Sequence, residues 1–431
     1  MRRYLLVSLI IGTAVTAVVL LLTRLGAFAP LAEALGRLYA SAGFLPAATG
    51  DAEGLEVACV VIAAFAAAWC TVDIPHPSHK ILVCLLLLLV LVGLSPTLAL
   101  HGVLYAPFPA VGSAVLATAA GFFYAGTESG LRKRLLLDLL GDRVSPATFA
   151  DLLDAREPLR LSGDTREVTV LTCRVFNHAS LREKLDPAEV VSMTNLFLRT
   201  TADFLLSRGA YLDESSPDSV RVYFGLLKPG ENHALDACRA ALELRPRLRN
   251  LNDECETRWF QRLDYGVAIS AGTMTVGVYG SPRHRYFTGI GGDADFARRL
   301  AQANVRYRSD VLISARCQQL VKDAIEVRPV EMVYDPGRHL LTEVYQLLAL
   351  TTDFSETDRE RRDAYWQGVI HYRAGRHDQA LACFARAAVP GREDGPLDYF
   401  VSLSRSHLPG YASTEPAEPT GPAHARLLNR M

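Results

Sequence analysis

Four long apolar runs in the first 125 residues constrain the fold of this chain more than any other feature. They span residues 4–23, 57–72, 81–100 and 108–125. Each run has about the length that an α-helix needs to cross a bilayer. Only about ten charged residues precede residue 126, although the 431-residue chain has 45 Lys and Arg and 46 Asp and Glu. We therefore predict a transmembrane region over residues 1–126; a signal peptide ending near Ala27 to Ala29 is the alternative for the first run.

The basic residues around these runs predict the orientation. Arg2 and Arg3 precede the first run, Lys80 lies between the second and third, and Arg132 to Arg134 follow the fourth. Basic residues favour the cytoplasmic side, so we expect a multi-pass protein of the inner (cell) membrane with the rest of the chain in the cytoplasm. The lipid bilayer is thus an expected partner. Residues 127–164 form a linker whose basic, leucine-rich helix either pairs with its copy in a dimer or lies on the membrane surface.

The remainder of the chain has the pattern of a globular α+β domain. A net charge of −1 gives no reason to expect nucleic-acid binding. The hydrophobic pattern predicts, in order, a strand at 167–176, a helix at 186–207, a hairpin at 209–225, a helix at 233–251, strands at 262–270 and 274–279 with a turn at Gly272, a helix at 292–303, and strands at 311–313, 326–333 and 342–348. This order is the split βαβ plan of a ferredoxin-like domain with additions.

Several motifs in this part resemble one known family. They are EVTVL at 167–171, YFG at 223–225, HALDACRAAL at 233–242, GVAISAG at 266–272, VGVYGS at 276–281, YFTGIG at 286–291, ARRL at 297–300 and EVYQL at 343–347. Together they resemble the class III adenylate/guanylate cyclase domain over residues 165–350. RLGAFAPL at 24–31 and VSP at 144–146 resemble bacterial membrane cyclases with an extracellular sensor of the CHASE type, here shortened to a loop of about thirty residues.

The resemblance implies a dimer, ATP or GTP as ligand, and two Mg²⁺ or Mn²⁺ ions held by two aspartates during cyclisation. The dimer would be a homodimer or a heterodimer with another cyclase domain. By position, the metal aspartates fall on Arg174 and Asp218, the purine-selecting pair on Glu214 and Thr288, the ribose-orienting asparagine on Asp295, the phosphate-stabilising arginine on Arg299, and a phosphate-binding lysine on Arg338.

Arg174 and Asp295 depart from the family pattern in ways that weaken catalysis. An arginine is always protonated and has no acceptor, so it does not ligate a metal. Asp295 adds negative charge near a polyphosphate. We therefore expect a degenerate domain, a pseudoenzyme without a metal cofactor, that serves as a regulatory or scaffold dimer in signal transduction. The alternative is an active adenylate or guanylate cyclase that uses Mg²⁺ or Mn²⁺ in an unusual metal site.

Two arrangements of Arg174 stay open. In one, its guanidinium forms a bidentate pair with Asp218, and the cleft binds a nucleotide phosphate without metal through Arg174, Arg299 and Arg338. In the other, Arg174 points to solvent and the cleft is empty.

The C-terminal part is predicted to be helical and then disordered. Residues 356–407 resemble one tetratricopeptide unit, two antiparallel helices about a turn at Gly375. This unit serves either as a groove for a partner or as a cap on the preceding domain. Residues 408–431 are rich in Pro, Ala, Gly and Thr, a composition typical of disorder.

Overall fold

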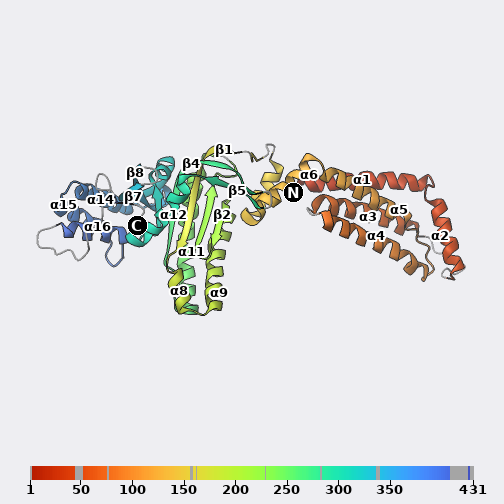
Figure 1. The fold of residues 1–431 in the computed structure, drawn as a ribbon, viewed down its shortest axis with the longest axis horizontal. Coiled ribbons are helices and arrows are strands. Elements are labelled where there is room, and N and C mark those ends of the chain that lie inside the picture. Colours follow the sequence, from red (N-terminus) through yellow and green to blue (C-terminus); the bar gives the residue numbers. More distant parts are fainter. Residues whose placement is uncertain are drawn as a thin grey trace. The chain divides into compact units, whose positions relative to one another are not determined.

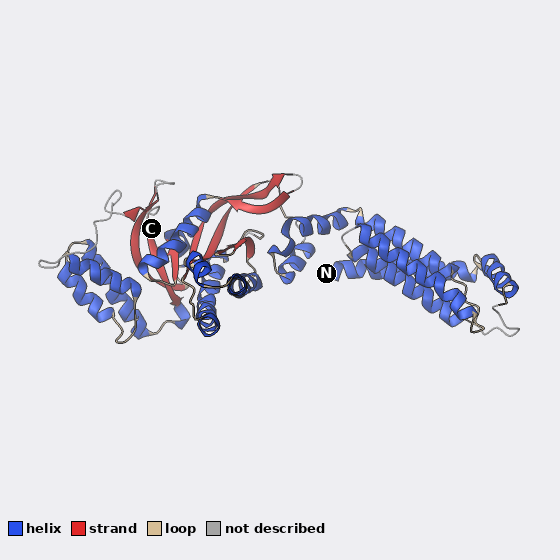
Figure 2. Cartoon of the chain, turned by 60° about the horizontal axis from the view of Figure 1, so that its bottom comes forward, coloured by secondary structure: helices blue, strands red, loops and turns tan. Residues whose placement is uncertain are grey.

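The chain divides into two compact units. The computed structural model describes residues 2–43, 52–74, 77–155, 159–161, 163–228, 230–281, 284–335, 340–407 and 426–427. The first unit consists of Met1–Gly141 and Phe149–Glu157, and the second of Asp142–Thr148 and Pro158–Met431. Figure 1 labels their elements, and Figure 2 colours the helices and strands.

The first unit is built of helices joined by short turns in its described residues. Its helices are α1 (Arg2–Arg24), α2 (Ala29–Ser41), α3 (Glu53–Asp73), α4 (Pro77–Ala99), α5 (Phe108–Ala125), α6 (Glu128–Leu140) and most of α7 (Pro146–Asp154). Within the described ranges, α1, α3, α4 and α5 are long and apolar enough to cross a membrane, which confirms the four predicted apolar helices. Small residues let α3 and α5 approach closely, since a Cβ on Gly121 would lie 1.8 Å from the Thr71 hydroxyl.

The second unit is built on one mixed sheet. Its strands are β1 (Asp164–Val175), β2 (Tyr211–Ser216), β3 (Ser219–Phe224), β4 (Tyr265–Ser281), β5 (His284–Ile290), β6 (Val311–Ser314), β7 (Ile325–Asp335), β8 (Leu340–Leu350) and β9 (Arg426–Leu427). Their order is β2-β3-β1-β4-β6-β8-β7-β9, and β5 pairs with β4 as an arm. The β4–β6 and β7–β9 pairs are parallel and the others antiparallel.

Helices cover both faces of this sheet. They are α8 (His178–Lys184), α9 (Pro187–Leu198), α10 (Phe204–Ser207), α11 (His233–Trp259), α12 (Gly292–Tyr307) and α13 (Ala315–Val321). Val267 and Ile269 of β4 pack with α9, α11 and α13, whereas Ala268 between them packs with α12. Because side chains alternate along a strand, α11 and α12 lie on opposite faces.

The turn predicted at Gly272 is wrong. Strand β4 runs without interruption for 17 residues, and Gly272 lies within it. The glycine is needed for close packing, because a Cβ there would lie 1.9 Å from a carboxylate oxygen of Asp293. Strand β5 and helix α8 were not predicted, and α11 continues past residue 251 to Trp259 with Pro246 inside it.

Three C-terminal helices pack against the sheet domain. They are α14 (Glu356–Arg373), α15 (His377–Ala387) and α16 (Gly395–Ser406), and Gly375 adopts a positive φ of 73° in the turn between the first two. Helix α14 contacts β7, and α16 contacts α12. Arg328 of β7 donates to Asp394 before α16 at 2.7 Å, and the Tyr365 hydroxyl of α14 donates to the Pro329 carbonyl at 2.9 Å. The predicted disordered tail lies outside the described residues except for β9.

Candidate functional site

The predicted metal positions lie at one end of β1 and the β2–β3 hairpin. In β1, Cys173 and Val175 face the core under α11, so Arg174 between them faces the opposite side of the sheet. Arg174 pairs in register with Ser219, the first residue of β3. The Val175 amide donates to the Asp218 carbonyl at 2.8 Å, which extends the ladder by one bond and fixes the hairpin turn beside Arg174.

Arg174 and Asp218 form an ion pair. Nη2 of Arg174 lies 3.5 Å from Oδ2 of Asp218, and the two side chains are 34% and 36% exposed. The other carboxylate oxygen, Oδ1, accepts from the Ser216 hydroxyl at 3.1 Å. Arg174 therefore points to Asp218 rather than to solvent. The contact is a single nitrogen–oxygen pair, so it differs from both arrangements left open by the sequence: Arg174 meets Asp218, but not in a bidentate geometry.

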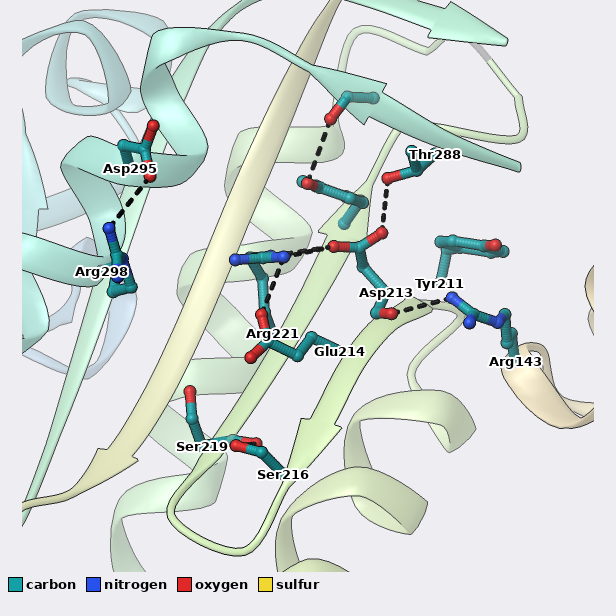
Figure 3. Close-up of polar contacts among 12 residues, drawn as sticks. Arg143, Tyr211, Asp213, Glu214, Ser216, Ser219, Arg221, Thr288, Asp295 and Arg298 are labelled. Atoms are coloured by element: carbon teal, nitrogen blue, oxygen red, sulfur yellow. Dashed lines mark hydrogen bonds and ion pairs between the residues drawn. The ribbon is translucent and has the colours of Figure 1, made fainter. Parts of the chain in front are cut away.

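Glu214 and Thr288, the residues at the predicted purine-selecting positions, each contact another side chain. A β-bulge in β2 between Leu212 and Glu214 turns Asp213 toward the arm, and the Thr288 hydroxyl of β5 donates to Asp213 rather than to Glu214 (Figure 3). Arg221 of β3 donates to Oδ2 of Asp213 from Nε at 2.9 Å, and its Nη2 lies 2.8 Å from a Glu214 oxygen. The Asp213 side chain is only 8% exposed, so the carboxylate that meets Thr288 is committed to internal partners.

Two buried tyrosines donate hydrogen bonds to the β5 arm, one on either side of Thr288. The Tyr211 hydroxyl donates to the Phe287 carbonyl, and the Tyr223 hydroxyl donates to the Gly289 carbonyl at 3.2 Å. Burial raises the pKa of Tyr211 to about 12 and that of Tyr223 still further. Both phenols therefore stay protonated and remain donors at neutral pH. Three consecutive residues of β5 are thus tied to the β2–β3 hairpin.

The predicted ribose and phosphate residues lie on α12. Asp295 is exposed and pairs with Arg298 at 3.3 Å, and Figure 3 draws both on the helix, apart from the hairpin. Nη2 of Arg299 lies 3.0 Å from both carboxylate oxygens of Asp335, whose side chain is 1% exposed. Arg338 lies outside the described residues. The structure therefore joins Arg174 to Asp218 and joins Arg299 to a buried aspartate at the end of β7.

The residues at the metal positions do not fit a divalent cation. One of the two is a guanidinium, which has five donors and no acceptor. One oxygen of the remaining carboxylate faces that guanidinium and the other accepts from Ser216. In the part of the chain that the structure describes, no three His, Cys, Asp or Glu side chains gather in a way that could hold a metal ion.

A cavity lies at the other end of the hairpin. It has a volume of about 280 Å³, and its lining includes Tyr211, Tyr223, Lys228, His233 and Thr148. Neither Glu214 nor Asp218 lines it. The cavity is therefore separate from the predicted site.

Sequence reasoning missed Asp213, Arg221 and Asp335. Strict alternation along β2 puts Asp213 and Glu214 on opposite faces, and only the bulge brings both carboxylates to one guanidinium. Arg221 alternates with the apolar Val220 and Val222, and this pattern indicated that Arg221 lies on the face of β3 away from the core. No local signal marked Asp335, because its partner is 36 residues away.

Comparisons with known proteins find relatives of low sequence identity. No protein-family model matches the chain. Adenylate cyclase 1 of Rhizobium meliloti is 24% identical over 193 residues, 45% of this chain and 29% of that protein. An adenylate cyclase of Anabaena cylindrica is 24% identical over 157 residues, covering 36% and 30%. An uncharacterized protein of Mycobacterium tuberculosis is 26% identical over 216 residues, covering 49% and 37%.

Two solved structures of cyclases are also similar to part of the chain. The guanylyl cyclase Cya2 matches with a TM-score of 0.42 and 25% identity, covering 45% of this chain and 97% of that one. The adenylyl cyclase CyaB from P. aeruginosa matches with a TM-score of 0.41 and 23% identity, covering 45% and 100%.

Over 36–45% of its length the chain is similar to adenylate cyclases, and four helices among its described residues are long and apolar enough to cross a membrane. It spans about a third of the length of the curated relatives that it matches.

Proposed function

We propose that this protein is a membrane-anchored signalling protein whose class III cyclase-homology domain is degenerate and acts as a regulatory or scaffold partner. The Arg174–Asp218 ion pair carries the proposal, because a positive charge stands where the family resemblance places a metal ligand. Near a protein surface, two unit charges about 4 Å apart interact by roughly 4 kcal/mol. The interaction energy doubles for a divalent cation. Because Arg174 is also positive, the interaction is a repulsion.

The other family positions support the same interpretation. Asp295 puts a carboxylate where an amide donor would orient the ribose, and this carboxylate faces Arg298. Arg299 is engaged with the buried Asp335, and Thr288 with Asp213. Binding a nucleotide through these groups would require each of them to exchange an internal partner for the ligand. This cost also weighs against metal-free phosphate binding by Arg174, Arg299 and Arg338.

The anchoring part of the proposal rests on the apolar helices and the basic residues beside them. Arg2, Arg3, Lys80 and Arg132 to Arg134 all lie on one side if α1, α3, α4 and α5 each cross the bilayer. By the positive-inside rule this side is cytoplasmic, and the cyclase-homology domain follows there. We assign the protein to the inner (cell) membrane, as a homodimer or a heterodimer with another cyclase domain.

The experiment is a cyclase assay of the full chain in lipid nanodiscs, with ATP or GTP and with Mg²⁺ or Mn²⁺. Mass spectrometry of the products is expected to find no cyclic nucleotide above the level of an Asp218→Ala control. Cyclic nucleotide that forms in the wild type and disappears in Asp218→Ala would overturn the proposal in favour of an active cyclase with an unusual metal site.

A repaired variant tests the chemical reason for the loss. Combining Arg174→Asp with Asp295→Asn restores both residue types that the family pattern requires. Measurable cyclic nucleotide is expected from this pair. Arg174→Lys with Asp295→Asn is the matched control, because it keeps the positive charge at the metal position and should stay inactive.

A further inference from the structure

Lys80, in the first turn of α4, is a buried ammonium group without a carboxylate partner among the described residues. Its side chain is packed into the helical unit, and the residue is only 6% exposed. Its Nζ lies 5.6 Å from the centre of the Phe122 ring of α5, and no carboxylate in the described part of the chain is within ion-pair distance. The ring attracts the ammonium but does not neutralise it. Because a buried charge is normally paired, Lys80 indicates a site for an anion.

The surroundings of Lys80 are electropositive. Lys133 and Arg134 of α6 both act on it electrostatically, and both carry the same sign of charge. The first turn of α4 contains no acidic residue, and the N-terminus of a helix carries a partial positive charge of its own. Each of these effects favours an anion beside Lys80.

Asp73, the last residue of α3, does not serve as the counter-ion of Lys80. Its Oδ1 lies 2.8 Å from Nζ of Lys133, which also donates to the Asp73 carbonyl at 2.9 Å. The same ammonium lies 5.0 Å from the centre of the Tyr4 ring of α1. Asp73 therefore neutralises Lys133, and the positive charges of Lys80 and Arg134 are left over at this end of the helical unit.

The ends of two apolar helices set the depth of this site. Two of the candidate membrane spans are Ser78–Ala99 and Phe108–Ala125. Lys80 is the third residue of the first span, and Phe122 lies three residues before the end of the second. A helix that crosses a bilayer ends at the level of the lipid headgroups. Basic side chains between such helices bind anionic headgroups at this level.

We propose that Lys80 and Arg134 bind the phosphate of an anionic phospholipid headgroup. The proposal rests on the anchoring part of the proposed function and does not depend on whether the cyclase-homology domain is degenerate. Phe122 is 36% exposed, so the ammonium above its ring lies near the surface of the helical unit, where a lipid reaches it. The net negative charge of an anionic lipid offsets the unpaired ammonium. A zwitterionic lipid binds more weakly, because its own cation already neutralises its phosphate.

Native mass spectrometry of the full chain in detergent tests this site. Phosphatidylglycerol is the anionic probe and phosphatidylcholine the zwitterionic probe, each added at the same concentrations. The wild type should retain phosphatidylglycerol more strongly than phosphatidylcholine. Lys80→Met keeps a long side chain without the charge and should lower the retention of phosphatidylglycerol by about fivefold, the factor for one basic residue near an anionic surface. Lys80→Arg keeps the charge and should keep the preference.

Two further variants separate the site from a general effect of positive charge. Arg37→Gln is the matched control, because it removes one charge from an exposed ion pair with Glu33 in the same unit, and it should leave retention unchanged. Arg134 is exposed, so Arg134→Gln leaves the packing intact. It should lower the retention of phosphatidylglycerol by a smaller factor than Lys80→Met, since water and salt screen an exposed charge more strongly.

The results that overturn the proposal are distinct from those that overturn the anchoring. Equal retention of both lipids by the wild type overturns the site, as does equal retention of phosphatidylglycerol by the wild type and Lys80→Met. Displacement of phosphatidylglycerol by millimolar inorganic phosphate overturns the assignment to a lipid. Flotation with phosphatidylcholine vesicles tests the anchoring by itself: a chain that floats without a lipid preference loses only the site, whereas a chain that does not float loses both. None of these measurements reads cyclase activity.

Discussion

Replacing Arg299 tests whether this arginine holds the fold or is available to a ligand. Its guanidinium lies 3.0 Å from both oxygens of Asp335, which is 1% exposed, while Arg299 itself is 25% exposed. Removing one member of a buried ion pair costs about 3–5 kcal/mol, because the other charge loses its partner in a desolvated site. Since Arg299 is partly exposed, we expect Arg299→Ala to lower the free energy of unfolding by about 3 kcal/mol, the low end of this range.

Thermal unfolding of the full chain, followed by tryptophan fluorescence, measures this loss. Trp259 and Trp366 both lie in the unit that contains the pair. For a domain of this size, 1 kcal/mol lowers Tm by about 2–4 °C, so Arg299→Ala should lower Tm by about 6–12 °C. Arg298→Ala is the matched control, because Arg298 is the adjacent residue on α12 and pairs with the exposed Asp295. An exposed pair contributes less than about 1 kcal/mol, so this Tm should fall by no more than about 4 °C.

Removing both charges separates an ion pair from a packing effect. Arg299→Met combined with Asp335→Leu should recover most of the lost stability, because neither charge is then left buried alone. If Arg299→Ala lowers Tm no more than Arg298→Ala, the reasoning is refuted. The pair with Asp335 would then contribute little to stability, and the case for a degenerate site would be weaker.

Three further predictions concern packing, docking and pH. Gly272→Ala should cost about 1–3 kcal/mol, seen as a lower Tm, because its Cβ would lie 1.9 Å from an Asp293 oxygen; an unchanged Tm contradicts the close approach. Arg328→Met should speed hydrogen exchange in α16 by at least tenfold, because it removes the buried bidentate partner of Asp394; unchanged exchange means that other contacts dock the helix. Burial lowers the pKa of His233, so the unfolded chain binds a proton at higher pH than the folded chain, and stability is lost as pH falls through about 6.5. His233→Gln should therefore reduce the fall in Tm between about pH 7.5 and 5.5, and an equal fall in both proteins contradicts this origin.

Local patterns were sufficient for the four apolar helices and for most of the sheet domain. The apolar runs and the motifs from EVTVL to EVYQL act through period and residue type, which a sequence displays directly. Gly272 misled the prediction, because glycine is typical both of turns and of close packing within a strand. The choice between these depends on Asp293, which lies on α12, 21 residues further along the chain.

The sequence by itself determined the four apolar helices, the resemblance to the class III cyclase domain, and the presence of an arginine at position 174, where that resemblance places an acid. Only the tertiary structure determined the hydrogen-bond and ion-pair partners of the site residues. Ion pairs and hydrogen bonds between distant strands depend on register, and a single bulged residue in β2 directs Asp213 rather than Glu214 to Thr288. The same dependence joins Arg299 to Asp335 and Arg143 to Asp213, because these partners meet only after the sheet and its helices have packed.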